Sequence, residues 1–390
     1  MAAVAAVYGL VTCVWVVFGT DLPGGRWLAV HLFTLGVVTN LILAFSDHFA
    51  RALTRQPGDA PVQQLLVANA GIAAVFVGVA GHRPWWAATG AMILSAVVLA
   101  SLLRLRRLRT SAVGPRFGWI VQTYELAHGA FLLGALFGAL VATDVLGGAW
   151  TGAVRIAHLH VNLLGWAGLT LLGTIVFFGP TISRTRIREG ADVRAARAVR
   201  LAAIGLGIGV SGIVGTGFGG SGGVATRLVA AAGLAAFAWA VTVVSIPVAR
   251  ASVAASAPDR WSILAVAAWF VVAGWSDVLA VAADAWRLLE PVGAAMLVGV
   301  LAQAILTSLG YVAPRLLHLD PVAAVPLTEV WGAGRAVVWN AGVGLIVVSG
   351  IAGHASGWST VGSVGWGLVL AAIAARVFVI ARAARSVRAT

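Results

Sequence analysis

The sequence predicts an all-α protein that crosses a lipid bilayer about twelve times. Of its 390 residues, 60% are hydrophobic and only 10% are charged, whereas a soluble domain carries roughly 25% charged residues. The apolar residues also fall into runs of about 20, which is the length that a helix needs to span the hydrocarbon layer. Both observations indicate a polytopic membrane protein whose solvent is lipid.

The expected spans follow from these runs, taken in order along the chain. They lie near 2–19, 27–46, 62–81, 86–103, 118–142, 153–180, 200–217, 225–246, 261–283, 291–313, 335–353 and 358–381. The first run lacks the basic region and the small-residue cleavage site of a signal peptide, so we interpret it as a span. The remaining runs are separated by short segments rich in Arg, Gly or Pro.

Arginines in the connecting segments predict the orientation of the chain. Every second connection and the C-terminal tail are rich in arginine: Arg51, Arg55; Arg104, Arg106, Arg107, Arg109, Arg116; Arg184, Arg186, Arg188, Arg194, Arg197, Arg200; Arg250, Arg260; Arg315; Arg382, Arg385, Arg388. The intervening connections carry single arginines. The positive-inside rule therefore places both termini in the cytoplasm and the protein in the inner (cytoplasmic) membrane. The same rule explains the net charge of +13, so no nucleic acid is expected as a partner. The expected partner is the lipid bilayer.

A weak internal repeat indicates how the helices are organised. Arg26-x4-His31-x4-Gly36 and Arg155-x4-His160-x4-Gly165 have identical spacing in the second and sixth predicted helices. Aligning Pro314 with Pro180 puts Ala294 and Gly299 at the corresponding positions of the tenth. We therefore predict one integral-membrane domain, 1–390, built from three four-helix arcs at 1–110, 111–246 and 247–390.

Four histidines within the predicted membrane zone are the candidate cofactor-binding residues. His31, His158 and His160 lie in its outer third, and His128 lies near the middle of 118–142. Ionisable groups in a bilayer are costly and mark functional sites, and neutral imidazole binds haem iron and copper. We expect His31, His158 and His160 to be the metal ligands. His158 and His160 lie about 200° apart around a helix, so they cannot both face one small ligand. The alternative for each histidine is a buried hydrogen bond between helices.

Two acidic residues form a second group of candidates. Glu125 and His128 share a helix face, so Glu125 is expected either to orient the imidazole of His128 or to be a paired structural carboxylate. Asp277 lies in 261–283, where it is expected to begin a proton path or to balance Arg335. Asn40, Asn69, Asn162, Gln303 and Asn340 are expected to form hydrogen bonds between helices. A single cysteine, Cys13, excludes both an internal disulfide and a cysteine-based metal site.

The sixth predicted helix carries a family resemblance. The string Arg155-Ile-Ala-His-Leu-His-Val-Asn-Leu-Leu-Gly-Trp-Ala-Gly-Leu-Thr, ending at Pro180, resembles subunit I-like members of the haem-copper oxidase superfamily. Together with His31-x4-Gly36 and the stretch from Ala302-Gln303 through Tyr311 to Pro314, it also resembles NnrS-type membrane proteins. The membrane domain attached to some actinobacterial copper nitrite reductases is similar as well.

The resemblance implies three four-helix arcs, with His31 as a low-spin haem ligand and His160 or His158 as a copper-side ligand. Ala294 stands where the family places haem ligands, and the 200–217 helix has no His-His pair, so a complete oxygen-reducing site is not expected. The implied function is a haem b- or copper-binding membrane protein of electron transfer or nitrogen-oxide handling, in respiration or denitrification. Quinone and a periplasmic redox or copper protein are the implied partners.

Two other classes of function remain open on the sequence alone. A proton-coupled secondary transporter also uses about twelve helices, with Asp277, Glu125 and His128 as coupling residues. A structural membrane subunit would use its polar residues only to pack helices. The sequence does not establish that the protein is an enzyme, and a haem absorption band would separate the first class from the other two.

Overall fold

The computed structural model is all-helical over the residues it describes, which are 2–19, 21–58, 61–111, 118–186, 190–353 and 357–388. Arg116, Arg188 and His354 lie outside these residues. Eleven helices are long and apolar enough to cross a membrane, and the shorter N-terminal helix is also apolar. Together they occupy the twelve predicted positions, so the all-α polytopic fold class is confirmed.

Several spans consist of consecutive α- and π-helical segments, so one span can contain more than one of the helices named below. In chain order they are α1 (Ala2–Phe18), α2 (Gly25–His31), η1 (Leu32–Thr39), α3 (Asn40–Thr54), α4 (Val62–Ala80), α5 (Pro84–Ser111), α6 (Gly118–Thr143), α7 (Gly148–His160), η2 (Val161–Leu169), α8 (Thr170–Ser183), α9 (Ala191–Gly215), η3 (Thr216–Phe218), α10 (Gly220–Ala254), α11 (Arg260–Ala282), η4 (Trp286–Leu288), α12 (Leu289–Ala294), η5 (Ala295–Ala302), α13 (Gln303–Leu316), α14 (Pro321–Thr328), α15 (Gly332–Ala352) and α16 (Trp358–Arg388).

The π-helical segments η1, η2 and η5 recur in the register that the sequence spacing indicated. They begin directly after His31, His160 and Ala294, and Gly36, Gly165 and Gly299 each stand fifth in their segment. Each segment packs against the long helix of the preceding span, α1, α6 or α11. A π-helical turn widens the helix and is common at functional sites. The local structure therefore repeats three times, while the three four-helix arcs themselves stay a prediction.

The repeated glycines let each π-helical segment approach its neighbour closely. A Cβ on Gly36 would lie 2.5 Å from the Tyr8 ring, and one on Gly165 would lie 2.6 Å from the Cβ of Ala130. The corresponding distance from Gly299 to the Trp269 ring is 2.8 Å. A side chain at any of the three positions would force its neighbour to shift, so glycine favours this close packing.

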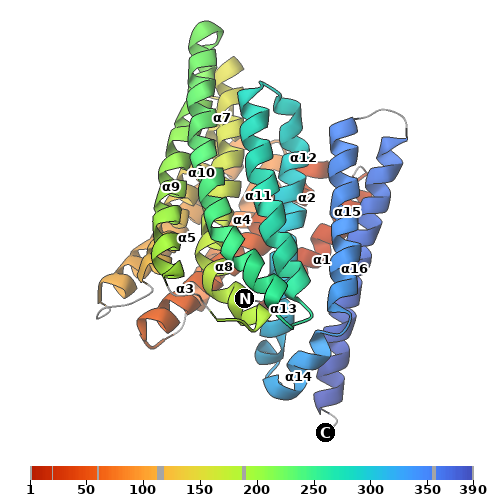
Figure 1. Ribbon diagram of the computed structural model, residues 1–390. Helices are drawn as coiled ribbons and strands as arrows, with labels where there is room; N and C mark the ends of the chain where they lie inside the picture. The colour runs from red at the N-terminus through yellow and green to blue at the C-terminus, as the bar shows by residue number, and fades with distance from the viewer. Residues whose placement is uncertain are drawn as a thin grey trace. The chain divides into compact units, whose positions relative to one another are not determined.

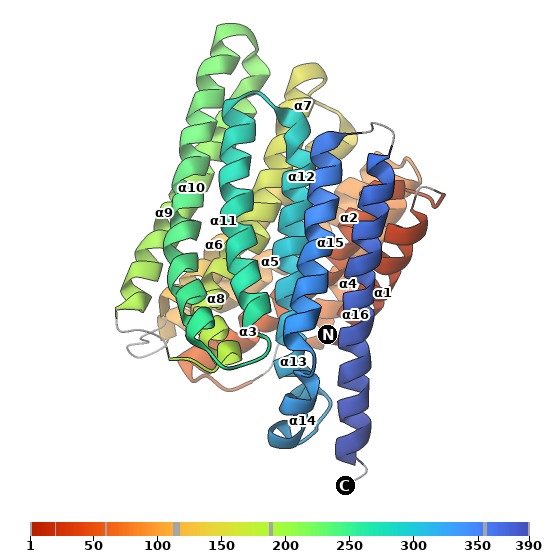
Figure 2. The same ribbon diagram turned by 45° about the vertical axis from the view of Figure 1, so that its right-hand side comes forward.

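The chain divides into two compact units. Unit 1 comprises 1–173 and 199–237, and unit 2 comprises 174–198 and 238–390. In unit 1, α4, α5 and α6 pack as successive neighbours. In unit 2, α15 and α16 run side by side, and the short α14 lies near the end of α13 (Figures 1 and 2). The core of unit 2 is apolar and includes Val298, Trp339, Val343, Ile346, Val369 and Ala372.

Polar side chains tie helices together within each unit, as the sequence predicted for Asn40, Asn69 and Asn340, whereas Asn162 bonds to His158 of its own span. Asn69 donates to the side chain of Asn40 at 2.9 Å in unit 1, and Trp269 donates to Asn340 at 2.7 Å in unit 2. Gln303 does not follow the prediction. Its side chain is buried, and neither of its polar atoms has a hydrogen-bond partner among the described residues.

Candidate functional site

His31 is held at the junction of α2 and the π-helical segment η1. The helix starts after Gly24, whose φ of 75° suits glycine. Nδ1 of His31 lies 2.8 Å from the carbonyl oxygen of Trp27, and the two rings stack with centroids 4.1 Å apart. Because a carbonyl oxygen can only accept, Nδ1 carries the proton and Nε2 keeps its lone pair.

His158, on α7, is held in the same tautomer by a different helix. Its Nδ1 lies 2.8 Å from the carbonyl oxygen of Gly134 on α6. Asn162 donates to the backbone carbonyl of His158 at 2.8 Å, which fixes the turn that carries the ring. A Cβ on Gly138 would approach the imidazole to 2.9 Å, so this glycine leaves room for the ring. Nε2 of His158 therefore also keeps its lone pair.

The two imidazoles lie close together in unit 1. Their ring centroids are 6.4 Å apart and their planes differ by 19°. Within the described parts of the chain, Nε2 of neither ring has a hydrogen bond, whereas both Nδ1 atoms do. The structure thus brings together two of the four predicted histidines, each with one ring nitrogen available as a ligand.

His160 does not join this pair. It is 1% exposed, and its Nδ1 lies 2.8 Å from the carbonyl oxygen of Ile156. It lies about 200° around the helix from His158, as helical geometry requires. Of the two histidines, His158 is the one whose ring contact with His31 the structure shows among the described residues, and which of them binds a metal stays a prediction.

His128 is fully buried and both of its ring nitrogens are engaged. Nδ1 lies 2.7 Å from the carbonyl oxygen of Tyr124, and Nε2 lies 3.1 Å from Oγ of Ser101 on α5. The ring meets the indole of Trp166 edge to face at 4.9 Å. His128 is therefore built into a hydrogen-bonded contact between helices and would have to release Ser101 before it could bind a metal.

Of the two roles expected for Glu125, the structure shows the paired carboxylate and not the contact with His128. Both carboxylate oxygens of Glu125 accept from Arg109, at 2.6 and 3.0 Å. A bidentate arginine pair of this kind is strong and directional. Side chains three apart on a helix share a face only roughly, and Arg109, close to the C-terminal end of α5, offers Glu125 a charged partner that His128 does not.

The predicted pairing of Asp277 with Arg335 is wrong. Asp277 is buried on α11, but Arg335 bonds instead to Asp259 at 3.0 Å. Asp259 precedes α11, while Asp277 stands near the other end of that helix. A helix rises 1.5 Å per residue, so eighteen residues separate the two carboxylates by about 27 Å. The role of Asp277 in a proton path stays a prediction.

Sequence reasoning missed two ionic clusters, each formed around a buried aspartate. In unit 2, Asp259 bonds to Arg376 at 2.7 Å as well as to Arg335, and all three side chains are at most 9% exposed. In unit 1, Asp47 bonds to Arg51 at 2.8 Å and to Arg104 at 2.6 Å. Arg376 carried a signal, because it interrupts an apolar run within the last predicted span. Arg51 and Arg104 lie near span ends and were interpreted only as determinants of topology, whereas Arg335 was expected to pair with Asp277.

Glu329 belongs to the surroundings of the cluster in unit 2. It accepts from Arg184 at 2.6 Å, next to the end of α14. Burial raises the pKa of its carboxyl above the usual value, and the nearby positive charge of Arg184 offsets only part of that effect.

Comparison with known proteins does not identify a family. The chain matches no protein-family model and no curated protein sequence. Among the described residues, no group of three or more His, Cys, Asp or Glu side chains is arranged to hold a metal ion. The His31–His158 pair in unit 1 is therefore the candidate site that geometry supports.

Proposed function

We propose that unit 1 binds a haem b between His31 and His158, and that the protein transfers electrons in the membrane. The observation that carries the proposal is the near-parallel imidazole pair with both Nε2 atoms available. The two ring centroids are 6.4 Å apart, and the two Nε2 atoms would be the groups that hold the haem iron.

The number of available nitrogens favours haem over copper alone. Haem supplies its own four equatorial nitrogens and needs only axial ligands from the protein. Copper sites of the electron-transfer type use three or more protein ligands, and no such group exists among the residues that the structure describes. A haem also fits the resemblance of the sixth span to haem-copper oxidase subunits.

The residues around the pair would hold and tune the group. The carbonyl oxygens of Trp27 and Gly134 orient the imidazoles and make their Nε2 atoms more basic. When bound, the haem would supply one-electron redox chemistry, with both axial positions filled by histidine. Such a site suits electron transfer rather than substrate binding. Quinone in the bilayer and a periplasmic redox or copper protein are the proposed partners, with nitrogen-oxide respiration as the metabolic setting.

The orientation in the membrane is part of the proposal. The arginine-rich connections support an inner-membrane protein with both termini in the cytoplasm. The histidine pair then lies toward the periplasmic side. Cysteine substitutions in the connections, tested with a membrane-impermeant thiol reagent on intact cells, measure this directly. Labelling of the arginine-rich connections from outside would contradict it.

The test of the cofactor is an absorption spectrum of the purified protein, oxidised and then reduced with dithionite, after expression with haem supplied. We expect a b-type difference spectrum that is lost in His31→Ala and in His158→Ala. His128→Ala and His160→Ala are the matched controls and should retain it. A colourless protein contradicts the proposal, and metal analysis that finds copper without haem would assign the pair to copper.

A further inference from the structure

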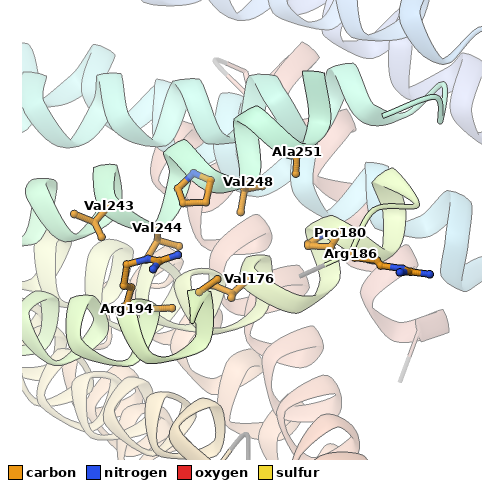
Figure 3. A pocket seen from close by; sticks show the side chains of 11 residues that line it. Val176, Pro180, Arg186, Arg194, Val243, Val244, Val248 and Ala251 are labelled. Atoms are coloured by element: carbon orange, nitrogen blue, oxygen red, sulfur yellow. The ribbon is translucent and has the colours of Figure 1, made fainter. Parts of the chain in front are cut away.

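A groove in unit 2 lies where α8, the start of α9 and the last part of α10 meet. It encloses about 500 Å³ of space, part of it open to the surroundings. Its walls are apolar and include Val176, Pro180, Val244, Pro247, Val248 and Ala251, and its polar side chains are Arg186 and Arg194 (Figure 3). Apart from the two arginines, the walls offer no hydrogen-bonding side chains.

Two prolines shape the groove. Pro180 and Pro247 both lie inside helices, α8 and α10. A proline has no N–H, so the carbonyl four residues earlier loses its donor within the helix. Those carbonyls belong to Val176 and Val243, and both residues line the groove. The two helices therefore bring backbone acceptors as well as apolar side chains to this place.

The two arginines differ from their neighbour in having no ion pair. Arg184, just before them, is bonded to Glu329. Arg186 and Arg194 are exposed, and neither forms a salt bridge with a described residue. Figure 3 shows the Arg194 side chain turned toward Val244, whereas Arg186 extends away past Pro180. Within the part of the chain that the structure describes, no carboxylate pairs with either arginine, so the groove combines positive charge with an apolar wall.

We propose that this groove binds an anionic phospholipid, with the phosphate on Arg194 and an acyl chain along the valines of α8 and α10. The charge is complementary, and basic pockets between membrane helices on the cytoplasmic side are suited to anionic headgroups. All three helices belong to spans long and apolar enough to cross the bilayer. The groove also lies next to the most arginine-rich connection in the chain. A small soluble anion would leave the apolar wall unused, so a lipid fits better than free phosphate.

The proposal is tested by native mass spectrometry of the full-length protein in detergent, titrated with phosphatidylglycerol. Phosphatidylcholine with the same acyl chains tests the charge, and glycerol phosphate tests the headgroup alone. We expect phosphatidylglycerol to bind at least fivefold more tightly than either. Arg194→Gln should weaken its binding about fivefold, and Arg197→Gln, the same change on the same helix but outside the groove, by less than twofold.

The apolar wall is tested separately from the charge. Ala251→Phe fills the groove and should reduce phosphatidylglycerol binding about fivefold. Val253→Phe is its control, because that side chain is 59% exposed on α10 and does not line the groove. Equal binding of the two lipids, or equal effects of Arg194→Gln and Arg197→Gln, would overturn the proposal. The proposal would also be overturned if the Ala251→Phe protein elutes from a size-exclusion column like the wild type and binds phosphatidylglycerol as tightly.

Discussion

Replacing Asp259 by asparagine removes the one carboxylate that both Arg335 and Arg376 share in unit 2. Asp259 accepts from Arg335 at 3.0 Å and from Arg376 at 2.7 Å, and the three side chains are 5%, 9% and 4% exposed. Asparagine has nearly the same size, so the packing is retained. The change leaves two buried guanidinium groups side by side without the negative charge between them.

The expected magnitude follows from what Arg376 retains. Breaking a buried ion pair by removing one partner costs about 3–5 kcal/mol. Arg376 keeps three backbone acceptors, the carbonyls of Leu306, Thr307 and Thr328, at 2.8–3.0 Å. These neutral bonds solvate part of the charge, which places the expected loss near the lower end of that range, at about 3 kcal/mol. Arg335→Gln should cost less, because Asp259 and Arg376 still pair.

The assay is equilibrium unfolding in mixed micelles of a denaturing and a mild detergent, followed by tryptophan fluorescence. Asp320→Asn is the matched control. Asp320 caps α14 by accepting from the backbone N–H of Val322 at 3.0 Å, and asparagine caps a helix equally well, so no more than about 0.5 kcal/mol should be lost. If Asp259→Asn costs under 1 kcal/mol, or less than Arg335→Gln, the reasoning about the buried charges is refuted.

Two further predictions concern packing and pH. Gly165→Ala should lower the unfolding free energy by about 1–3 kcal/mol because the new methyl group meets Ala130. The control, Gly367→Ala, lies on α16 with open space around it and should leave the unfolding free energy unchanged or raise it by up to about 1 kcal/mol. Equal effects of the two substitutions in the same unfolding assay would refute the close approach of Gly165 to Ala130. The raised pKa of Glu329 means that the folded state binds more protons than the unfolded state at mildly acidic pH. Wild-type stability should therefore fall relative to Glu329→Gln as the pH rises from about 4.5 through the folded-state pKa, and parallel pH profiles of the two proteins would contradict this.

Features that depend on regular spacing along the chain could be predicted from the sequence alone. Apolar runs of about 20 residues predict spanning helices because every backbone polar group must be satisfied inside the helix in lipid. Gly36, Gly165 and Gly299 were aligned by spacing alone, and each proved to be the fifth residue of a π-helical segment. The contacts of three asparagines could be predicted for a related reason, since a polar amide in an apolar run needs a partner on another helix.

The contacts that a side chain makes with residues on other helices could not be predicted from the sequence in the same way. The sequence could not decide whether His158 or His160 faces His31, because a helix has two sides and spacing does not say which one meets the neighbour. It also suggested His128 as a partner of Glu125 and Arg335 as a partner of Asp277, whereas the structure pairs Glu125 with Arg109 and Arg335 with Asp259. The true partners are 16 and 76 residues away in sequence, beyond any local pattern.

The sequence by itself thus determined the class of fold, the approximate places of the spans and the histidines worth testing, because hydropathy and helical period act along one chain. Only the tertiary structure decided which imidazoles meet, which charges are buried together and where Arg194 borders an apolar groove. Those relations depend on how each helix is rotated and how deeply it packs against its neighbours. Rotation and packing depth are fixed by contacts between distant residues such as Gly165 and Ala130.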